Sequence, residues 1–570
     1  MPLALGVVSL SCAWGQQYVI NTYAGNRTAG FSGDGGAPTS AQLDLPLGLA
    51  LDSSNNLYIV DSANQRIRKI SGGNISTVAG NGTGGYSGDG AAATAAELLD
   101  PSAVAVDSAG NLYIADTNNH VIRMVSTSGT ITTIAGDNTG GYAGDTGAAV
   151  DAELEFPTGV AVDGAGNIYI ADSGNNVIRE VSGGIINTIV GGFPGQFLND
   201  PESVAVDSSG NLYISEQSGY RISKFSNGTL TTLAGNGQGG FSGDNGPATS
   251  ASLFQPSGIA LDSKGYLYIC DTLNGRIRKI SPGGIITTIA GLGTPGYFGD
   301  GGPATGALLF FPHGVVVDPS GNVYISDTDN YIVRSLKPQT PSIASGGVGN
   351  AASFTPKFSP GALATVFGAD FTGTGLEATA STLPIAPSLG GVSVQVNGVS
   401  APVLYASSTQ INFQIPWETK VGSASVLVSV NGLPSSAVSI TVQAAAPGLF
   451  VQGTHAAALN SDFTLNDDSN PAKGGATILA YLTGAGAVTH QPADGAAAGS
   501  GSNLSTVTAT VTASIGGQNA VVSSTSLAPG FVGLWQANIV VPAGLPQGDA
   551  PLLVTVGGQT SNSANVNVAP

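Results

Sequence analysis

Aspartate and arginine recur at fixed spacing in the first part of this chain, and such residues form ion pairs, cap turns or bind cations. One column of acids follows strand-like Tyr-Ile-Ala text, and an arginine follows each acid by seven residues. The acids are Asp61, Asp116, Asp172, Asp271 and Asp327, and the arginines are Arg68, Arg123, Arg179, Arg278 and Arg334. One further copy replaces both members at once, with Glu216 and Ser223. This joint departure predicts a structural contact between the columns, while capping of the following turn is the alternative role for the acid.

A second column of acids lies in glycine-rich insertions, and each acid follows an aromatic residue by three positions. The acids are Asp34, Asp89, Asp145, Asp244 and Asp300, and the aromatic residues are Phe31, Tyr86, Tyr142, Phe241 and Tyr297. An aspartate between glycines suits local hydrogen bonds from backbone N–H groups. A ring of such carboxylates is alternatively suited to Ca²⁺ or to a polyol such as a glycan. We expect the aromatic residues to anchor the insertions on a neighbouring sheet; fully exposed, they would stack against sugar rings.

Four histidines are present, and one of them is a candidate ligand-binding residue. His313 directly follows Pro312 at the start of a predicted innermost strand, whereas His120 lies in a turn and is part of the repeat. We find no Ser-His-Asp arrangement, no phosphate-binding loop and no Cys-x-x-Cys pair. The sequence therefore predicts a protein that is not an enzyme, with no catalytic residue, no metal-ligand set and no cofactor, Ca²⁺ being the one candidate ion.

The composition narrows the classes of partner. The chain has 570 residues, a net charge of −19 and only 17 basic side chains. Such a surface repels phosphate backbones and anionic membranes, so nucleic acid is not an expected partner. No apolar run reaches the roughly 18 residues that a membrane-spanning helix needs. The cysteines, Cys12 and Cys270, are not expected to form a disulfide, and the chain is expected to be a monomer.

The first 15 residues predict a signal peptide. Residues 3–10 are apolar, and Ala13 and Gly15 fit a small-residue cleavage site. A basic n-region is missing, which indicates a truncated leader; a buried or disordered tail is the alternative. Export would place the protein outside the cell, in the periplasm or on the cell surface.

The elements that carry the acids and arginines are short strands in six similar units. A different aspartate ends the first strand of each unit, at Asp52, Asp107, Asp163, Asp207, Asp262 and Asp318. Each unit supplies four strands, but the last unit lacks its fourth, and a lone copy of that strand begins near Asn21. The N-terminal strand is therefore expected to complete the last sheet and to close a six-bladed β-propeller. The insertions and the turns between second and third strands should lie on the same face of the propeller.

The units resemble NHL repeats over about residues 18–337, with Asn119-His120-Val121 as the nearest copy of the Asn-His-Leu text. The resemblance implies a propeller fold. Propeller lyases and lactonases that resemble this fold hold a metal with several histidines or acids around a central channel. The inner-strand positions here are mainly glycine, valine, alanine and leucine, so the chain departs from that arrangement.

The C-terminal part predicts a different, all-β architecture. We expect the propeller over residues 16–337, a linker over 338–348, and two immunoglobulin-like β-sandwiches in tandem over 349–443 and 444–570. The two halves repeat related text, such as residues 410–416 and 536–542. This region resembles the IPT/TIG-like module of exported Acidobacteria (Solibacter-type) proteins.

Together these features predict an exported, non-enzymatic binding or scaffold protein. The loop-rich face of the propeller would bind a protein, a peptide or an extracellular glycan. Two alternatives remain at this stage. One is a propeller lyase, lactonase or glycan-cleaving enzyme, and the other is a structural protein of the cell envelope.

Overall fold

The computed structural model describes residues 18–192, 195–372, 377–430 and 432–569. The predicted signal peptide lies outside the described residues. The described chain is made of β-strands and one-turn 3-10 segments, without an α-helix, and it divides after Gln339 into two compact units. Within these residues no helix is long and apolar enough to cross a membrane.

The N-terminal unit consists of six antiparallel sheets over the described residues 18–338. The first three sheets are β2–β5 (Pro46–Leu51, Leu57–Asp61, Arg66–Ser71, Asn74–Ala79), β6–β9 (Ala103–Val106, Leu112–Asp116, Val121–Val125, Ile131–Ala135) and β10–β13 (Pro157–Val162, Ile168–Asp172, Val177–Ser182, Ile185–Val190). The fourth and fifth are β14–β17 (Pro201–Val206, Leu212–Glu216, Arg221–Ser226, Thr229–Ala234) and β18–β22 (Gly246–Pro247, Pro256–Leu261, Leu267–Asp271, Arg276–Ile280, Ile285–Ala290). The sixth joins β23–β25 (Pro312–Val317, Val323–Asp327, Ile332–Pro338) to β1 (Tyr18–Ala24).

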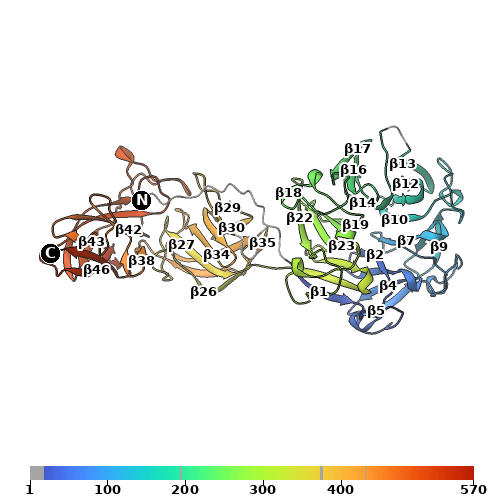
Figure 1. Cartoon of the computed structure of the whole chain (residues 1–570), viewed down its shortest axis with the longest axis horizontal. Helices are drawn as coiled ribbons and strands as arrows, with labels where there is room; N and C mark the ends of the chain where they lie inside the picture. The colour runs from blue at the N-terminus through green and yellow to red at the C-terminus, as the bar shows by residue number, and fades with distance from the viewer. Residues whose placement is uncertain (1–17, 193–194, 373–376, 431, 570) are drawn as a thin grey trace. The chain divides into compact units, whose positions relative to one another are not determined.

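The first strands of these sheets form a closed ring. Each of β2, β6, β10, β14, β19 and β23 contacts the first strand of the next sheet, and β23 returns to β2. Figure 1 shows β2, β10, β14, β19 and β23 toward the middle of the unit and β5, β9, β13 and β17 toward its rim. The sixth sheet is completed by β1, which runs antiparallel to β25 from Tyr18 opposite Pro338 to Ala24 opposite Val333. This is the pairing that the missing fourth strand predicts.

The core of the N-terminal unit lies between adjacent sheets. The second strand of a sheet, such as β3, is buried along its whole length because its sheet packs on both sides. One buried cluster, for example, combines Val60 and Ile67 of the first sheet with Val104 and Ile114 of the second. Apolar β-branched residues on both faces of these strands explain the continuous apolar runs in the sequence.

The column that includes Asp107 stabilises the hairpins between first and second strands. Asp107 Oδ1 accepts hydrogen bonds from the N–H groups of Ala109 and Asn111, at 2.9 and 2.8 Å. Gly110 between them has φ of 93°, which favours glycine, and the first sheet has Asn55 with φ of 60° at the equivalent position. The Gly-Asn turn expected from the sequence is thus present.

One-turn 3-10 segments occupy the connections of the N-terminal unit. Those between second and third strands are η2 (Ser62–Asn64), η4 (Thr117–Asn119), η6 (Ser173–Asn175), η8 (Thr272–Asn274) and η10 (Thr328–Asn330). Those in the insertions are η1 (Pro38–Ser40), η3 (Ala93–Ala95), η5 (Ala149–Asp151), η7 (Ala248–Ser250) and η9 (Ala304–Gly306).

The C-terminal unit begins with two sheets that enclose one buried cluster of residues 348–442. One sheet contains β26 (Ser342–Asn350), β27 (Leu363–Ala369), β28 (Glu377–Thr379), β32 (Val403–Ser407) and β33 (Gln410–Gln414). The other contains β29 (Ser388–Leu389), β30 (Val392–Val396), β31 (Val399–Ala401), β34 (Gly422–Val430), β35 (Leu433–Pro434) and β36 (Val438–Val442). The expected linker 338–348 is corrected here, because β26 pairs with β27 and most of that segment is therefore strand.

The second half of the C-terminal unit has its own buried cluster, which surrounds Trp535. Its strands are β37 (Gly448–Leu449), β38 (Val451–Gln452), β39 (His455–Ala456), β40 (Ala458–Asn460), β41 (Ala472–Lys473), β42 (Thr477–Thr483), β43 (Val511–Ile515), β44 (Gln518–Leu527), β45 (Trp535–Val540), β46 (Gly548–Val556), β47 (Gln559–Thr560) and β48 (Ala564–Ala569), with η11 at Gly501–Asn503. The long strand β44 pairs with β43 and with β45, so it joins the two parts of this sheet.

Candidate functional site

Five buried arginines each hold two carboxylates in the described part of the N-terminal unit. Arg68 is fully buried, and its Nη1 lies 3.0 Å from Asp61 Oδ2 while its Nη2 lies 2.6 Å from Asp34 Oδ1. The same arrangement joins Arg123 to Asp116 and Asp89, Arg179 to Asp172 and Asp145, Arg278 to Asp271 and Asp244, and Arg334 to Asp327 and Asp300. The predicted contact between the acid and arginine columns is present, and the insertion acids are part of it.

The fourth sheet has no long insertion before it, and its buried carboxylate is paired with a different arginine. Glu216 is buried and receives hydrogen bonds from Arg221 Nε and Nη2, both at 2.8 Å. Ser223, which stands where the other units have arginine, donates its hydroxyl to the same carboxylate. The joint change in the sequence therefore reflects one rearranged ion pair.

The aromatic residues of the insertions stack on these arginines. The guanidinium of Arg68 lies 4.8 Å from the ring centre of Phe31, and that of Arg66 lies 3.8 Å from it. Equivalent contacts join Arg123 to Tyr86, Arg179 to Tyr142, Arg278 to Phe241 and Arg334 to Tyr297. These rings anchor the insertions through one face and leave the rest in solvent, since Tyr86 is 39% exposed and Tyr142 is 52% exposed.

The two columns of carboxylates differ in pKa. The inner carboxylates are those at the ends of the second strands, and the outer carboxylates are those of the insertions. Burial raises the pKa of Asp116, Asp172 and Asp327 to about 6, against the lowering effect of the hydrogen bonds that each accepts. At Asp300, burial is outweighed by the hydrogen bond from Thr22 and the charge of Arg334, which lower the pKa of that carboxyl. Because an arginine neutralises each outer acid, this column is poorly suited to a cation.

The insertions and the turns between second and third strands lie on the same side of the N-terminal unit. Asn64, in such a turn, donates from Nδ2 to the carbonyl of Gly30 at 2.7 Å, and Gly30 opens the insertion. The same bond joins Asn119 to Gly85, Asn175 to Gly141, Asn274 to Gly240 and Asn330 to Gly296. We call this side the loop-rich face, as the strand connections predict.

A ring of variable residues in left-handed backbone conformation surrounds the start of the inner strands on this face. In each sheet, the residue before the first proline of the inner strand has positive φ although it is not glycine. These six residues, named the mouth ring here, are Leu45, Asp100, Phe156, Asp200, Gln255 and Phe311, with φ between 47° and 58°. Bulky residues seldom adopt this conformation, and its cost is commonly accepted at functional sites. Phe156 is 44% exposed and Leu45 is 38% exposed.

His313 contacts Glu202 next to the mouth ring. Its Nε2 lies 3.1 Å from Oε1 of Glu202, and both side chains are largely shielded from solvent. The two residues lie on β23 and β14, and Ser257 of the intervening strand β19 occupies the equivalent position. The position after the proline holds Leu47, Ser102, Thr158, Glu202, Ser257 and His313 in chain order. Ser257 Oγ donates to the carbonyl of His313 at 2.9 Å, which fixes this part of the ring.

His120 supports the mouth ring from outside. Its ring lies 4.7 Å from that of Phe156, and its Nδ1 accepts the Phe156 N–H at 3.2 Å. The structural role expected for His120 agrees with these contacts.

Comparisons with known proteins agree with the repeat pattern. The family model described as the Teneurin NHL domain matches residues 81–141 and 237–295, and the model described as the NHL repeat matches residues 43–70, 154–179 and 311–333. This chain contains NHL repeats. Residues 18–339 are called the NHL region below.

Curated relatives match about half of this chain. Protein SUPPRESSOR OF QUENCHING 1, chloroplastic, of Arabidopsis thaliana is 30% identical over 53% of this chain and 26% of its own length. Teneurin-1 of Mus musculus is 28% identical over 50% of this chain and 10% of its own length. The chain therefore spans about a quarter or less of these relatives.

The solved structures that match include one described as a binding protein and one described as a lyase. An auxiliary nutrient binding protein from Bacteroides thetaiotaomicron is 18% identical, with a TM-score of 0.43 over 57% of this chain and 77% of its own. A streptogramin B lyase is 14% identical, with a TM-score of 0.37 over 57% of this chain and 98% of its own.

Sequence reasoning missed Glu202 and the mouth ring of the NHL region. Glu202 is the one acid at a position that holds serine, threonine, leucine or histidine in the other repeats, so a search for departures at each position would have found it. The left-handed conformation of Phe156 or Phe311 carries no such signal, because glycine or asparagine usually marks it.

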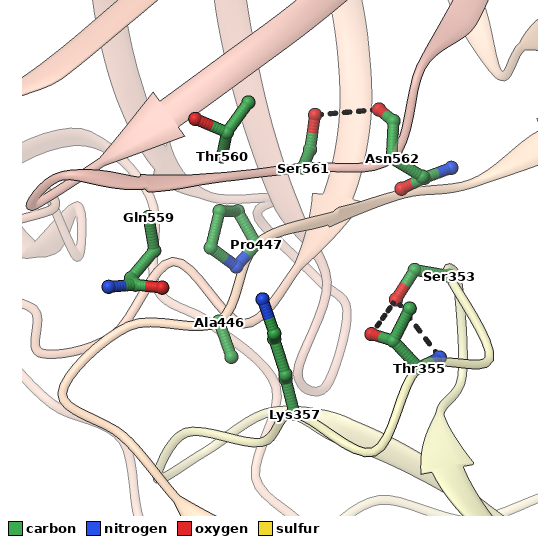
Figure 2. A pocket seen from close by; sticks show the side chains of 9 residues that line it. All are labelled: Ser353, Thr355, Lys357, Ala446, Pro447, Gln559, Thr560, Ser561 and Asn562. Carbon is green, nitrogen blue, oxygen red and sulfur yellow. Dashed lines mark hydrogen bonds between the residues drawn. The ribbon is translucent and has the colours of Figure 1, made fainter.

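The C-terminal unit contains a pocket of about 200 Å³, separate from the residues that the sequence singled out. Its lining comprises Ser353, Thr355, Lys357, Ala446, Pro447, Gln559, Thr560, Ser561 and Asn562. Figure 2 shows the Lys357 side chain extending from one half of the unit toward Pro447 of the other. Hydroxyl and amide groups with one ammonium group suit a small polar or acidic ligand.

Proposed function

We propose that this chain is an exported, non-enzymatic binding protein. In this proposal the NHL region is a six-bladed β-propeller that binds a protein, peptide or extracellular glycan on its loop-rich face. The C-terminal unit is proposed to be two immunoglobulin-like sandwiches of the IPT/TIG kind that act as a spacer, an anchor or a second adhesive unit.

The observation that supports this function most is the mouth ring. Its backbone is the same in all six sheets, whereas its side chains differ: two phenylalanines, one leucine, two aspartates and one glutamine. Variable side chains on a rigid, constant scaffold are typical of recognition surfaces. Phe156 is half-exposed and its neighbours in the ring are Asp100 and Asp200, so this part of the ring offers stacking and hydrogen bonding to the same ligand.

The insertion acids and their aromatic neighbours have a supporting role in this proposal. Each acid is held by a buried arginine, as Asp34 is by Arg68, and each aromatic ring covers that arginine. They would therefore fix the loops around the mouth ring, and the ligand would contact mainly the ring itself and His313.

The test is ligand capture by the full chain on glycan and peptide arrays, followed by affinity measurements on variants. Phe156→Ala with Phe311→Ala is expected to weaken the captured ligand at least tenfold, because both rings lie at the mouth. Phe531→Ala is the control, since Phe531 is 57% exposed but lies in the C-terminal unit. Failure of the wild-type chain to capture any ligand, or equal affinity of all variants, would overturn the proposal.

A second candidate function rests on the pair of His313 and Glu202. A histidine beside a carboxylate inside the inner ring suits general acid–base chemistry, as in a lyase, lactonase or glycan-cleaving enzyme. Turnover of a captured lactone or glycan that His313→Ala abolishes, with binding retained, would favour this function. Binding without turnover by the wild-type chain would reject it for that ligand.

A further inference from the structure

Three potential metal ligands converge in the C-terminal unit. His455, Asp468 and Asp549 each offer one ligand atom, and these atoms all lie within 4.8 Å of one another. His455 Nε2 and Asp549 Oδ1 are 2.7 Å apart, with 26% and 43% of the side chains exposed. An imidazole nitrogen with two carboxylate oxygens is a donor set that Zn²⁺ and related ions accept.

Paired strands position two of these residues. His455 on β39 lies opposite Asn565 of β48 in a parallel pair, and Asp549 on β46 lies opposite Asn567 of β48 in an antiparallel pair. The histidine and this aspartate therefore flank the same strand. The paired strands hold the two backbones in place, so an ion would have to open only the side-chain hydrogen bond between His455 and Asp549.

The third residue lies in the loop between β40 and β41, which two buried asparagines attach to β48. Asn466 Nδ2 donates to the Asn567 carbonyl at 2.9 Å, and the Asn567 N–H donates to Asn466 Oδ1 at 2.7 Å. Asn466 is 2% exposed and Asn567 is 7% exposed. This reciprocal pair holds Asp468 above the strand.

Amide groups orient the carboxylates in the way that outer groups do in metal sites. Asn567 Nδ2 lies 2.6 Å from Asp468 Oδ1 and 3.4 Å from Asp549 Oδ1. Asn565 Nδ2 donates to Asp549 Oδ2 at 3.2 Å. Each carboxylate is thus fixed by one or two neutral donors, which raises the precision of a ligand set without neutralising its charge.

We propose that His455, Asp468 and Asp549 form a binding site for a divalent transition-metal ion of the Zn²⁺ class. The bound ion fastens the loop with Asp468 to the strands with His455 and Asp549, so it stabilises the C-terminal unit. Ca²⁺ is a poor occupant, because it prefers six to eight oxygen ligands and seldom uses imidazole. The partly exposed side chains leave space for water to complete the coordination.

Calorimetric titration of the chelator-treated full chain with ZnCl₂ at pH 7.5 tests the site. We expect one equivalent to bind, with an affinity that falls at least tenfold in His455→Ala and in the isosteric Asp549→Asn. His490→Ala is the matched control, since His490 is an exposed histidine of the same unit whose Nδ1 lies 3.4 Å from the Leu504 carbonyl, and it should bind like the wild type. Millimolar Ca²⁺ should not displace the metal.

A second readout separates metal binding from misfolding. Zn²⁺ should raise the melting temperature of the wild type and of His490→Ala, but not that of His455→Ala. The circular dichroism spectra of the metal-free variants should be alike. The proposal is overturned if the wild type binds no Zn²⁺, or if His455→Ala and His490→Ala bind it equally well.

Discussion

Arg68 shows how one side chain can organise a whole repeat. Its guanidinium joins the second strand of its sheet, through Asp61, to the insertion that precedes the sheet, through Asp34. The insertion acid is 34 residues away in sequence, which is why the spacing of seven revealed the first contact and not the second. A regular spacing reveals partners that are close in sequence, such as Asp61 and Arg68. It does not reveal partners such as Asp34, because these meet only when the insertion folds back onto the sheet.

Replacing Arg68 should be costly. Arg68→Ala leaves the buried Asp61 without its cation, and losing one partner of a buried pair costs about 3 kcal/mol. We expect the free energy of unfolding of the NHL region, from urea titration at pH 7.5, to fall by about that amount. Arg66→Ala is the control, because Arg66 lies two positions away on β4, donates hydrogen bonds to backbone carbonyls and stacks on Phe31 at the surface. A loss under about 1 kcal/mol for Arg68→Ala would contradict the proposed role of the buried pair.

At the scale of elements, the six repeats of the sequence predicted the strands, the hairpins and the closing strand β1. The strand boundaries could be predicted because the same residue types recur at the same positions in each repeat. The strand β26 was mistaken for a linker, since its text Ser-Ile-Ala-Ser-Gly-Gly is typical of flexible connections. Its pairing with β27 overrides that local preference. The position of Glu202 opposite His313 likewise depends on how the inner strands close into a ring.

The closing strand should be essential to the stability of the NHL region. Tyr18, Ile20 and Ala24 of β1 are buried, and the strand covers the edge of β25. Deleting residues 16–25 should lower the melting temperature by more than 10 °C, since about 1.5–3 kcal/mol is lost for each large apolar side chain that is no longer buried. The free edge should also promote association between chains.

A synthetic peptide of residues 16–25 provides the control for that deletion. Added in excess, it should restore part of the lost melting temperature, because the site for β1 is otherwise complete. A scrambled peptide should have no effect. An unaltered melting temperature in the deletion variant would show that β1 does not support the sheet as its pairing indicates.

On the scale of the whole molecule, the chain consists of two units that share no buried cluster in the described residues. Every cluster of the NHL region is made of residues 18–336, and every cluster of the C-terminal unit is made of residues 343–568. Since a domain is stabilised mainly by its own core, each unit should unfold independently.

Fragments 18–339 and 340–569 should each fold, and their calorimetric unfolding curves should add up to that of the full chain. Arg68→Ala should shift only the transition of the first fragment, and Zn²⁺ only that of the second. A single cooperative transition in the full chain, at a temperature that neither fragment shows, would mean that the units stabilise each other.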